Sequence, residues 1–155
     1  MKSRSRHHLL VATVGDGSHH RSWISGPADR SFDVLLVDYG GGGRRFASDA
    51  DILFERQGTK FRLVKWALAQ LDIEQYELFF FPDDDLDFTT EDASRLFEIC
   101  KAQDLMLAQP ALDATSMVSF EITRAVPGSF LRYTNFVEVM CPVFIASTTL
   151  TPNVS

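Results

Sequence analysis

Four aspartates stand close together near the middle of the chain, directly after a short apolar run. The run is Leu78 to Phe81, Pro82 ends it, and the aspartates are Asp83, Asp84, Asp85 and Asp87. So many carboxylates at neighbouring positions repel one another unless a cation lies among them. Mg²⁺ and Mn²⁺ prefer oxygen ligands, and Mg²⁺ sites commonly use one or two carboxylates and leave the other positions to water and phosphates. The cluster therefore indicates a divalent metal site.

Two other interpretations of this stretch stay open. Acidic residues are often simply solvated, and a helix is expected to begin just after them, where its dipole favours negative charge. The run Asp85-Leu86-Asp87-Phe88-Thr89 also resembles the Asp-x-Asp-x-Thr motif of haloacid-dehalogenase phosphatases, in which Asp85 would form an aspartyl-phosphate. That family places its motif on the first strand, with a Lys and further aspartates downstream, which this chain does not match well.

The elements that must position the aspartates alternate along the chain. This alternation predicts an α/β fold with a mostly parallel central sheet, right-handed crossovers and flanking helices. We expect Thr59 to cap the first long helix and Thr89 or Thr90 the second. Val118–Ile122 and Phe136–Met140 alternate in polarity and are predicted to be antiparallel additions to the sheet. The predicted parallel strands are His8–Val14, Asp33–Tyr39, Leu78–Phe81 and Leu105–Gln109, and the helices are Lys60–Leu71 and the segment ending near Lys101.

Other candidate residues lie where these expected elements begin or end. Asp16 follows the first strand within the turn Gly15–Ser18, and Asp38 lies at the end of the second. Open α/β sheets bind ligands at this edge, and an acidic residue there can hold a ribose hydroxyl. The run Gly40–Arg45 is interpreted first as a flexible linker and second as a phosphate-binding loop. Lys60 opposes the dipole of its own helix, a cost that the phosphates or base of a nucleotide would offset.

Composition and charge narrow the class of protein. The chain has 155 residues, of which 45% are hydrophobic, enough for one soluble globular domain with a core. The net charge is −6, and the segment 83–104, with eight acidic and two basic residues, accounts for all of it. An acidic patch argues against nucleic acid as a partner and for a cation.

The remaining residue types give weaker signals. Cys100 and Cys141 are too few for a disulfide scaffold and are expected to be reduced core residues. We expect the four histidines to be ordinary exposed residues. The chain shows neither a transmembrane segment nor a signal peptide, and a cytoplasmic location is therefore expected.

Five phrases in the sequence, in this order, resemble the domain-of-unknown-function family 707, which in turn is similar to the GT-A class of glycosyltransferases. The likeness extends from His7 to Ile145. The phrases are His8-Leu-Leu-Val-Ala-Thr-Val-Gly-Asp-Gly-Ser18, Gly58-Thr-Lys-Phe61, Phe81-Pro-Asp-Asp-Asp85, Ala108-Gln-Pro-Ala-Leu112 and Arg132-Tyr-Thr-Asn-Phe-Val-Glu-Val-Met140.

The resemblance implies a metal-dependent glycosyltransferase that uses a nucleotide-diphosphate sugar, such as a UDP-sugar, and an unknown acceptor. Asp83 and Asp85 match the Asp-x-Asp that binds Mn²⁺ or Mg²⁺ at the donor diphosphate, with Asp84 between them in the donor site. Asp16 and Asp38 match positions near the base or ribose. The metal would stabilise the departing diphosphate, and a protein carboxylate would deprotonate the acceptor.

The chain departs from this family pattern at its end. Family members continue beyond Pro142-Val143-Phe144 with a segment rich in Trp, Gly and Asp, which by analogy carries the acceptor side and the base. This chain ends at Ser155 in a polar tail. We therefore expect one GT-A-like domain over residues 1–155, the donor-binding half without its acceptor half, in which Glu138 is the remaining candidate for the base. The alternative is a non-catalytic metal- or nucleotide-binding remnant of such an enzyme.

Overall fold

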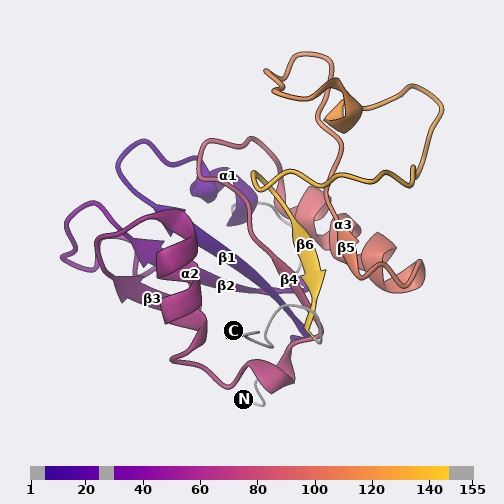
Figure 1. The fold of residues 1–155 in the computed structure, drawn as a ribbon. Helices are drawn as coiled ribbons and strands as arrows, with labels where there is room; N and C mark the ends of the chain where they lie inside the picture. Colours follow the sequence, from indigo (N-terminus) through magenta and orange to yellow (C-terminus); the bar gives the residue numbers. More distant parts are fainter. Residues whose placement is uncertain (1–5, 25–29, 147–155) are drawn as a thin grey trace, which may run out of the picture.

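A computed structural model describes residues 6–24 and 30–146, which form one sheet covered by helices (Figure 1). The strands run in the order β3-β2-β1-β4-β6-β5 across the sheet. β1 pairs in parallel with both β2 and β4, β2 pairs in parallel with β3, and β6 is antiparallel to β4 and β5. The strands are β1 (His8–Val14), β2 (Asp33–Asp38), β3 (Ile52–Glu55), β4 (Leu78–Phe80), β5 (Leu107–Ala108) and β6 (Val143–Ile145).

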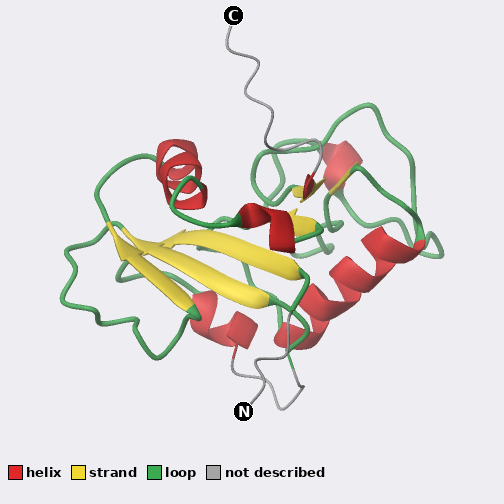
Figure 2. Ribbon diagram, turned by 90° about the horizontal axis from the view of Figure 1, so that it is seen from below, coloured by secondary structure: helices red, strands yellow, loops and turns green. Residues whose placement is uncertain are grey.

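Helices lie on both faces of the sheet (Figure 2). α2 (Lys60–Leu68) covers one face, and α1 (His20–Ile24) and α3 (Thr90–Ala102) cover the other. Short 3₁₀ turns occur at Ile73–Gln75 and Glu121–Thr123. No helix in the described ranges is long and apolar enough to cross a membrane.

The alternation of side chains along β1 builds two separate cores. Leu9 and Val11 pack in the cluster that includes α2, whereas Leu10 and Ala12 pack in the cluster that includes α1 and α3. All four side chains are fully buried. Successive residues of a strand point to opposite faces, so a continuously apolar strand predicts a sheet that is covered on both sides.

Most of the predicted parallel core is confirmed. β1 lies at the predicted residues, and β2 and β4 each end one residue earlier than predicted. α2 and α3 begin where their threonines indicated, although α2 ends at Leu68 and not at Leu71. Thr89 forms a full capping box with Asp92, whereas Thr59 stands at the N-cap of α2 without a side-chain hydrogen bond. The mixed sheet, mostly parallel and flanked by helices, is the α/β architecture expected from the sequence.

The predictions fail in the last third of the chain. Val118–Ile122 and Phe136–Met140 are not strands, and residues 109–142 leave the sheet and return to it (orange to yellow in Figure 1). Phe120 is 49% exposed and packs its ring 4.7 Å from that of Phe136, which replaces strand pairing with a local aromatic contact. Alternating polarity without a neighbouring sheet edge does not make a strand. The predicted Leu105–Gln109 shrinks to the two-residue β5, and it pairs antiparallel with β6.

Candidate functional site

The carboxyl ends of β1, β2 and β4 meet at one edge of the sheet, because these three strands run in parallel. Asp84 joins the loops that follow them. Its carboxylate accepts hydrogen bonds from Ser18 Oγ and, at 2.7 Å, from Tyr39 Oη, and its backbone carbonyl accepts from the amide of His19 at 2.7 Å. The hydrogen bond to Asp84 raises the pKa of Tyr39. Through these hydrogen bonds, Asp84 links the loop after β4 to the segments that follow β1 and β2.

Tyr39 also explains the glycine in the turn after β1. A Cβ atom at Gly15 would lie 2.6 Å from Cε2 of the Tyr39 ring, closer than real Cβ contacts allow. The Tyr39 ring therefore packs directly on the backbone of Gly15, and in this position its hydroxyl donates to Asp84. The Gly15–Ser18 turn therefore makes a close approach to Tyr39.

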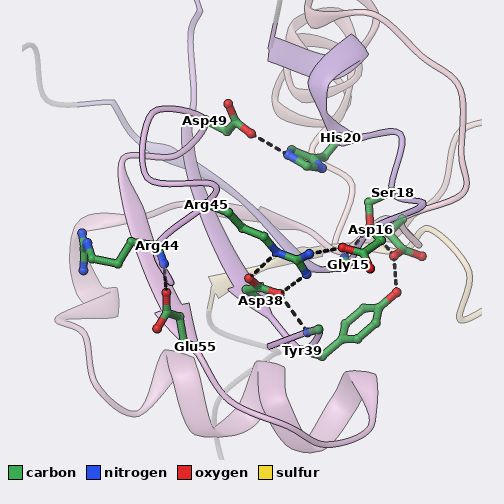
Figure 3. A network of polar contacts seen from close by, with 12 residues as sticks. Gly15, Asp16, Ser18, His20, Asp38, Tyr39, Arg44, Arg45, Asp49 and Glu55 are labelled. Atoms are coloured by element: carbon green, nitrogen blue, oxygen red, sulfur yellow. Dashed lines mark hydrogen bonds and ion pairs between the residues drawn. The ribbon is translucent and has the colours of Figure 1, made fainter. Parts of the chain in front are cut away.

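Arg45 binds the two acidic residues that were predicted to lie near a base or ribose (Figure 3). Its Nε and Nη2 donate to the two carboxylate oxygens of Asp38, each at 2.9 Å, and its Nη1 donates to Asp16. Asp38 is only 2% exposed, and it also accepts from the amide of Gly40 at 2.8 Å. The hydrogen bonds from Arg45 hold the pKa of Asp38 below its usual value, against the opposing effect of burial. We name Asp16, Asp38 and Arg45 the arginine clamp.

The glycine run that precedes Arg45 is ordered in the structure rather than a featureless linker. Gly41, Gly42 and Gly43 all have positive φ, and Arg44 follows with φ 52°. Backbone of this kind favours glycine, since other residues clash there. The amide of Arg44 donates to Glu55 at the end of β3 (Figure 3). The run therefore reverses the chain sharply enough to return Arg45 to Asp38.

Asp83 and Asp85 line a cavity of about 780 Å³, and Asp84 does not. Asp85 is exposed, and no side-chain partner is present for it within the described part of the chain. α3 forms one wall of the cavity through residues such as Leu96 and Ile99. The acidic loop itself, Leu105 and parts of the segments 108–117, 130–131 and 140–141 contribute the other walls. The two ends of the predicted Asp-x-Asp thus share one cavity, and its middle residue points elsewhere.

The loop that carries the aspartates is fixed at both ends. At its start, the amides of Phe81 and Asp83 donate to the carbonyls of Pro142 (3.0 Å) and Met140 (2.7 Å), and Pro82 lies between them with no amide to pair. Near its other end, between Asp85 and Asp87, Nε1 of Trp23 in α1 donates to the carbonyl of Leu86 at 2.8 Å. This anchoring lets a short loop hold several like charges in place.

Lys60 reaches the same loop from the other face of the sheet. Its Nζ donates to Asp83 and to the carbonyls of Phe81 (3.0 Å), Val139 (3.0 Å) and Met140 (3.3 Å). The side chain is 17% exposed. These oxygens offset the unfavourable position of a cation in the first turn of a helix. The structure thus brings Lys60 to the acidic loop, as a counter-charge to Asp83.

Glu138, the candidate base, lies beside this region but outside the cavity lining. Its amide donates to Gln109 Oε1 at 2.6 Å, and its own Oε2 is enclosed without a hydrogen-bond partner in the described residues. Met140 and Cys141, just after it, do line the cavity. The structure therefore leaves the role of Glu138 as a prediction.

Both cysteines are buried, and burial disfavours their thiolate forms. Burial raises the pKa of Cys141 to about 12 and that of Cys100 to about 11. Over residues 6–24 and 30–146, no three His, Cys, Asp or Glu side chains gather as a ready-made metal site. The carboxylates that the acidic loop presents to the cavity are those of Asp83, Asp85 and Asp87, of which Asp83 contacts Lys60 and Asp87 lies 2.7 Å from His19 Nδ1. Such oxygen donors are of the type that Mg²⁺ and Mn²⁺ prefer.

Two residues of this edge depart from what the sequence indicated. His20 was expected to be exposed, but it is 2% exposed, with its Nε2 2.9 Å from Asp49 (Figure 3). Arg45 was part of a run interpreted mainly as a linker. One signal in the sequence indicates that Arg45 binds carboxylates. Arg45 follows the glycines 40–43 and lies between Asp38, which ends β2, and Glu55, which ends β3.

Comparison with known proteins identifies the family of the chain and supports its fold. Residues 2–132 match the family model described as "Protein of unknown function (DUF707)", and the chain belongs to this family. Among solved structures, S. aureus TarS has a similar fold, with a TM-score of 0.53 and 9% sequence identity over 74% of this chain. The chain spans only 23% of the length of TarS. A search of curated proteins finds no match.

Proposed function

We propose that this domain binds the nucleotide-diphosphate sugar donor of a GT-A-type glycosyltransferase, with the diphosphate at the acidic loop. The fold shared with TarS supports the α/β architecture, and the likeness of the five sequence phrases to a GT-A-like family supports a glycosyltransferase-like role. The single observation that carries the proposal is the placement of Asp83 and Asp85 in one cavity at the carboxyl edge of parallel strands. Ligands of open α/β sheets bind at that edge.

The size and lining of the cavity suit this class of ligand. Small-molecule sites commonly enclose about 300–1,000 Å³ and combine apolar walls with a few polar groups. Here the acidic loop supplies the polar groups, and Leu96, Ile99 and Phe88 supply apolar wall. A diphosphate cannot approach the uncompensated carboxylate of Asp85 without a cation between them.

In this proposal, Asp85 and the second carboxylate oxygen of Asp83 hold Mg²⁺ or Mn²⁺. When bound, the metal supplies charge stabilisation for the departing diphosphate. Asp84 contributes by holding the loops together through Ser18 and Tyr39. Asp16 and Asp38 remain candidates for the nucleoside, and Glu138 remains the candidate that accepts the proton of the acceptor. The donor site does not depend on Glu138.

Calorimetric titration of UDP into the full chain tests the donor site, with and without Mn²⁺. We expect binding that requires Mn²⁺ and that Asp85→Asn abolishes. Glu98→Gln is the matched control, because Glu98 is exposed on α3, belongs to the same acidic segment and does not line the cavity. Equal losses of UDP affinity in the two variants would show that Asp85 contributes only negative charge to this region and not a specific metal ligand. No UDP binding in either condition would overturn the proposal for uridine nucleotides.

A further inference from the structure

The ammonium of Lys60 has more acceptors around it than it has protons to donate. Four oxygens surround it: one from the Asp83 carboxylate and three from the carbonyls of Phe81, Val139 and Met140. A lysine ammonium has three N–H donors. If Asp83 turned away, one carbonyl would remain for each donor. Lys60 can therefore release Asp83 without losing a satisfied hydrogen bond.

We propose that Lys60 is the resident counter-ion of Asp83 and competes with the divalent metal for it, so that tight metal binding requires the nucleotide. The inference rests on the donor site proposed above and concerns its regulation. Without ligand, the ammonium neutralises Asp83, which leaves Asp85 as the one free carboxylate of the pair. A metal ion that takes Asp83 then lies close to an ammonium fixed by backbone carbonyls.

This fixed positive charge lowers the affinity for metal alone and favours the metal–diphosphate complex. The repulsion between Lys60 and the metal acts in a partly buried place, where solvent screens it weakly. A diphosphate brings negative charge to both cations and offsets the repulsion. Metal and nucleotide should thus each strengthen the binding of the other by the same factor.

The ammonium of Lys60 contacts two separate chain segments besides its own helix. Lys60 begins α2, Phe81 and Asp83 belong to the acidic loop, and Val139 and Met140 belong to the segment that returns to β6. The ammonium stays attached to both chain segments whether or not Asp83 is bound to it. Exchange at Asp83 therefore requires rotation of one carboxylate and no movement of α2.

Calorimetric titration of Mn²⁺, with and without saturating UDP, tests this competition. In the unmodified chain we expect UDP to tighten Mn²⁺ binding about tenfold or more, a factor like that by which a charge within a few ångströms shifts an ionisation equilibrium. Lys60→Met should bind Mn²⁺ alone about tenfold more tightly and should lose most of the coupling to UDP. Lys65→Met, an equal charge change on an exposed position of α2, should leave both affinities within about twofold.

Two further variants distinguish loss of the Lys60 charge from misfolding caused by the substitution. Lys60→Gln keeps an amide donor for the carbonyls while removing the charge, and it should reproduce the gain if Lys60→Met is poorly folded. In an Asp83→Asn background, Lys60→Met should give a much smaller gain, because the competition for that carboxylate is gone and only the repulsion between the ammonium and the metal remains. Circular dichroism checks folding of each variant.

The outcomes separate this inference from the donor site itself. Unchanged or weaker Mn²⁺ binding in a folded Lys60→Gln chain, with UDP and Mn²⁺ still bound in an Asp85-dependent way, would overturn the competition and keep the donor site. A gain of equal size in Lys65→Met would show a long-range charge effect and would also overturn it. Absence of Mn²⁺ binding to the unmodified chain in the presence of UDP would overturn both proposals.

Discussion

Arg45 donates from two guanidinium nitrogens to the two carboxylate oxygens of Asp38, each at 2.9 Å. Paired donors of this kind fix both the distance and the orientation of the two groups. Asp38 is buried at the end of a central strand, and Arg45 arrives there from the glycine run. The pair thus ties the loop between β2 and β3 to the edge where the candidate site lies.

Removing the guanidinium should destabilise the fold, because a buried carboxylate without its counter-charge is costly. We expect Arg45→Ala to lower the free energy of unfolding clearly more than Arg44→Ala, as measured by urea denaturation. Arg44 is the neighbouring residue, it is exposed, and it donates to Glu55 through its backbone amide and not through its side chain. Similar losses in the two variants would contradict a special role for the clamp.

The clamp should also make the fold sensitive to acid. Arg45 holds the pKa of Asp38 below its ordinary value. A carboxyl with a lower pKa in the folded chain stabilises the fold above its unfolded pKa, and this stabilisation is lost as the pH falls through the folded value. We expect the free energy of unfolding to decrease below about pH 5, where an ordinary aspartate begins to protonate, and to keep decreasing until the pH has passed the lower pKa of folded Asp38. Asp38→Asn should be less stable at pH 6 and lose less on acidification. Parallel pH curves for the two chains would refute this.

The two threonine caps should differ in energy although both stand at an N-cap. Thr89 Oγ1 accepts from the amide of Asp92, and Asp92 Oδ2 accepts from the amide of Thr89 at 2.8 Å. Thr59 makes no side-chain cap hydrogen bond. We expect Thr89→Ala to cost about 1 kcal/mol and Thr59→Ala less than about half of that, measured by urea denaturation. A larger loss at Thr59 would mean that its side chain does cap α2.

Both cysteines should be unreactive while the chain is folded. Cys100 is 1% exposed and Cys141 is fully buried, and burial raises their pKa values to about 11 and about 12. Thiolates are the reactive form, so an aromatic disulfide reagent at pH 8 should find no fast thiol in the native chain and two in urea. One fast native thiol would show that a cysteine is accessible, and a cysteine-to-serine variant would identify which.

The sequence predicted the elements that a single strong local rule specifies. β1 and β2 are mostly apolar along their whole length, as a strand buried on both faces must be. The capping box of α3 corresponds to Thr89 with the acidic Asp92 three residues later. The sequence also places Asp83 and Asp85 on one loop after β4, at the carboxyl end of a parallel strand, whereas the cavity that they line depends on α3 and residues 105–141.

The failures share a different physical origin. β6 has three residues and follows Pro142, too short a run to give a periodic signal, and its place between β4 and β5 depends on tertiary pairing. The partners of Arg45 and Lys60 lie on other strands and loops, so no local pattern announces them. Val118–Ile122 alternates in polarity but finds no sheet edge to join.

The position of β6 has a consequence for the order of assembly. β4 pairs with β1 on one side and with β6 on the other, and Phe80 lies opposite Val143 in that second pairing. As the chain leaves the ribosome, β1 to β4 can associate early, whereas β5 has no strand to join until β6 has been made. Contacts between distant residues form late because closing a long loop costs entropy. The wall of the cavity built by residues 108–141 therefore forms last, against an acidic loop that is already in place.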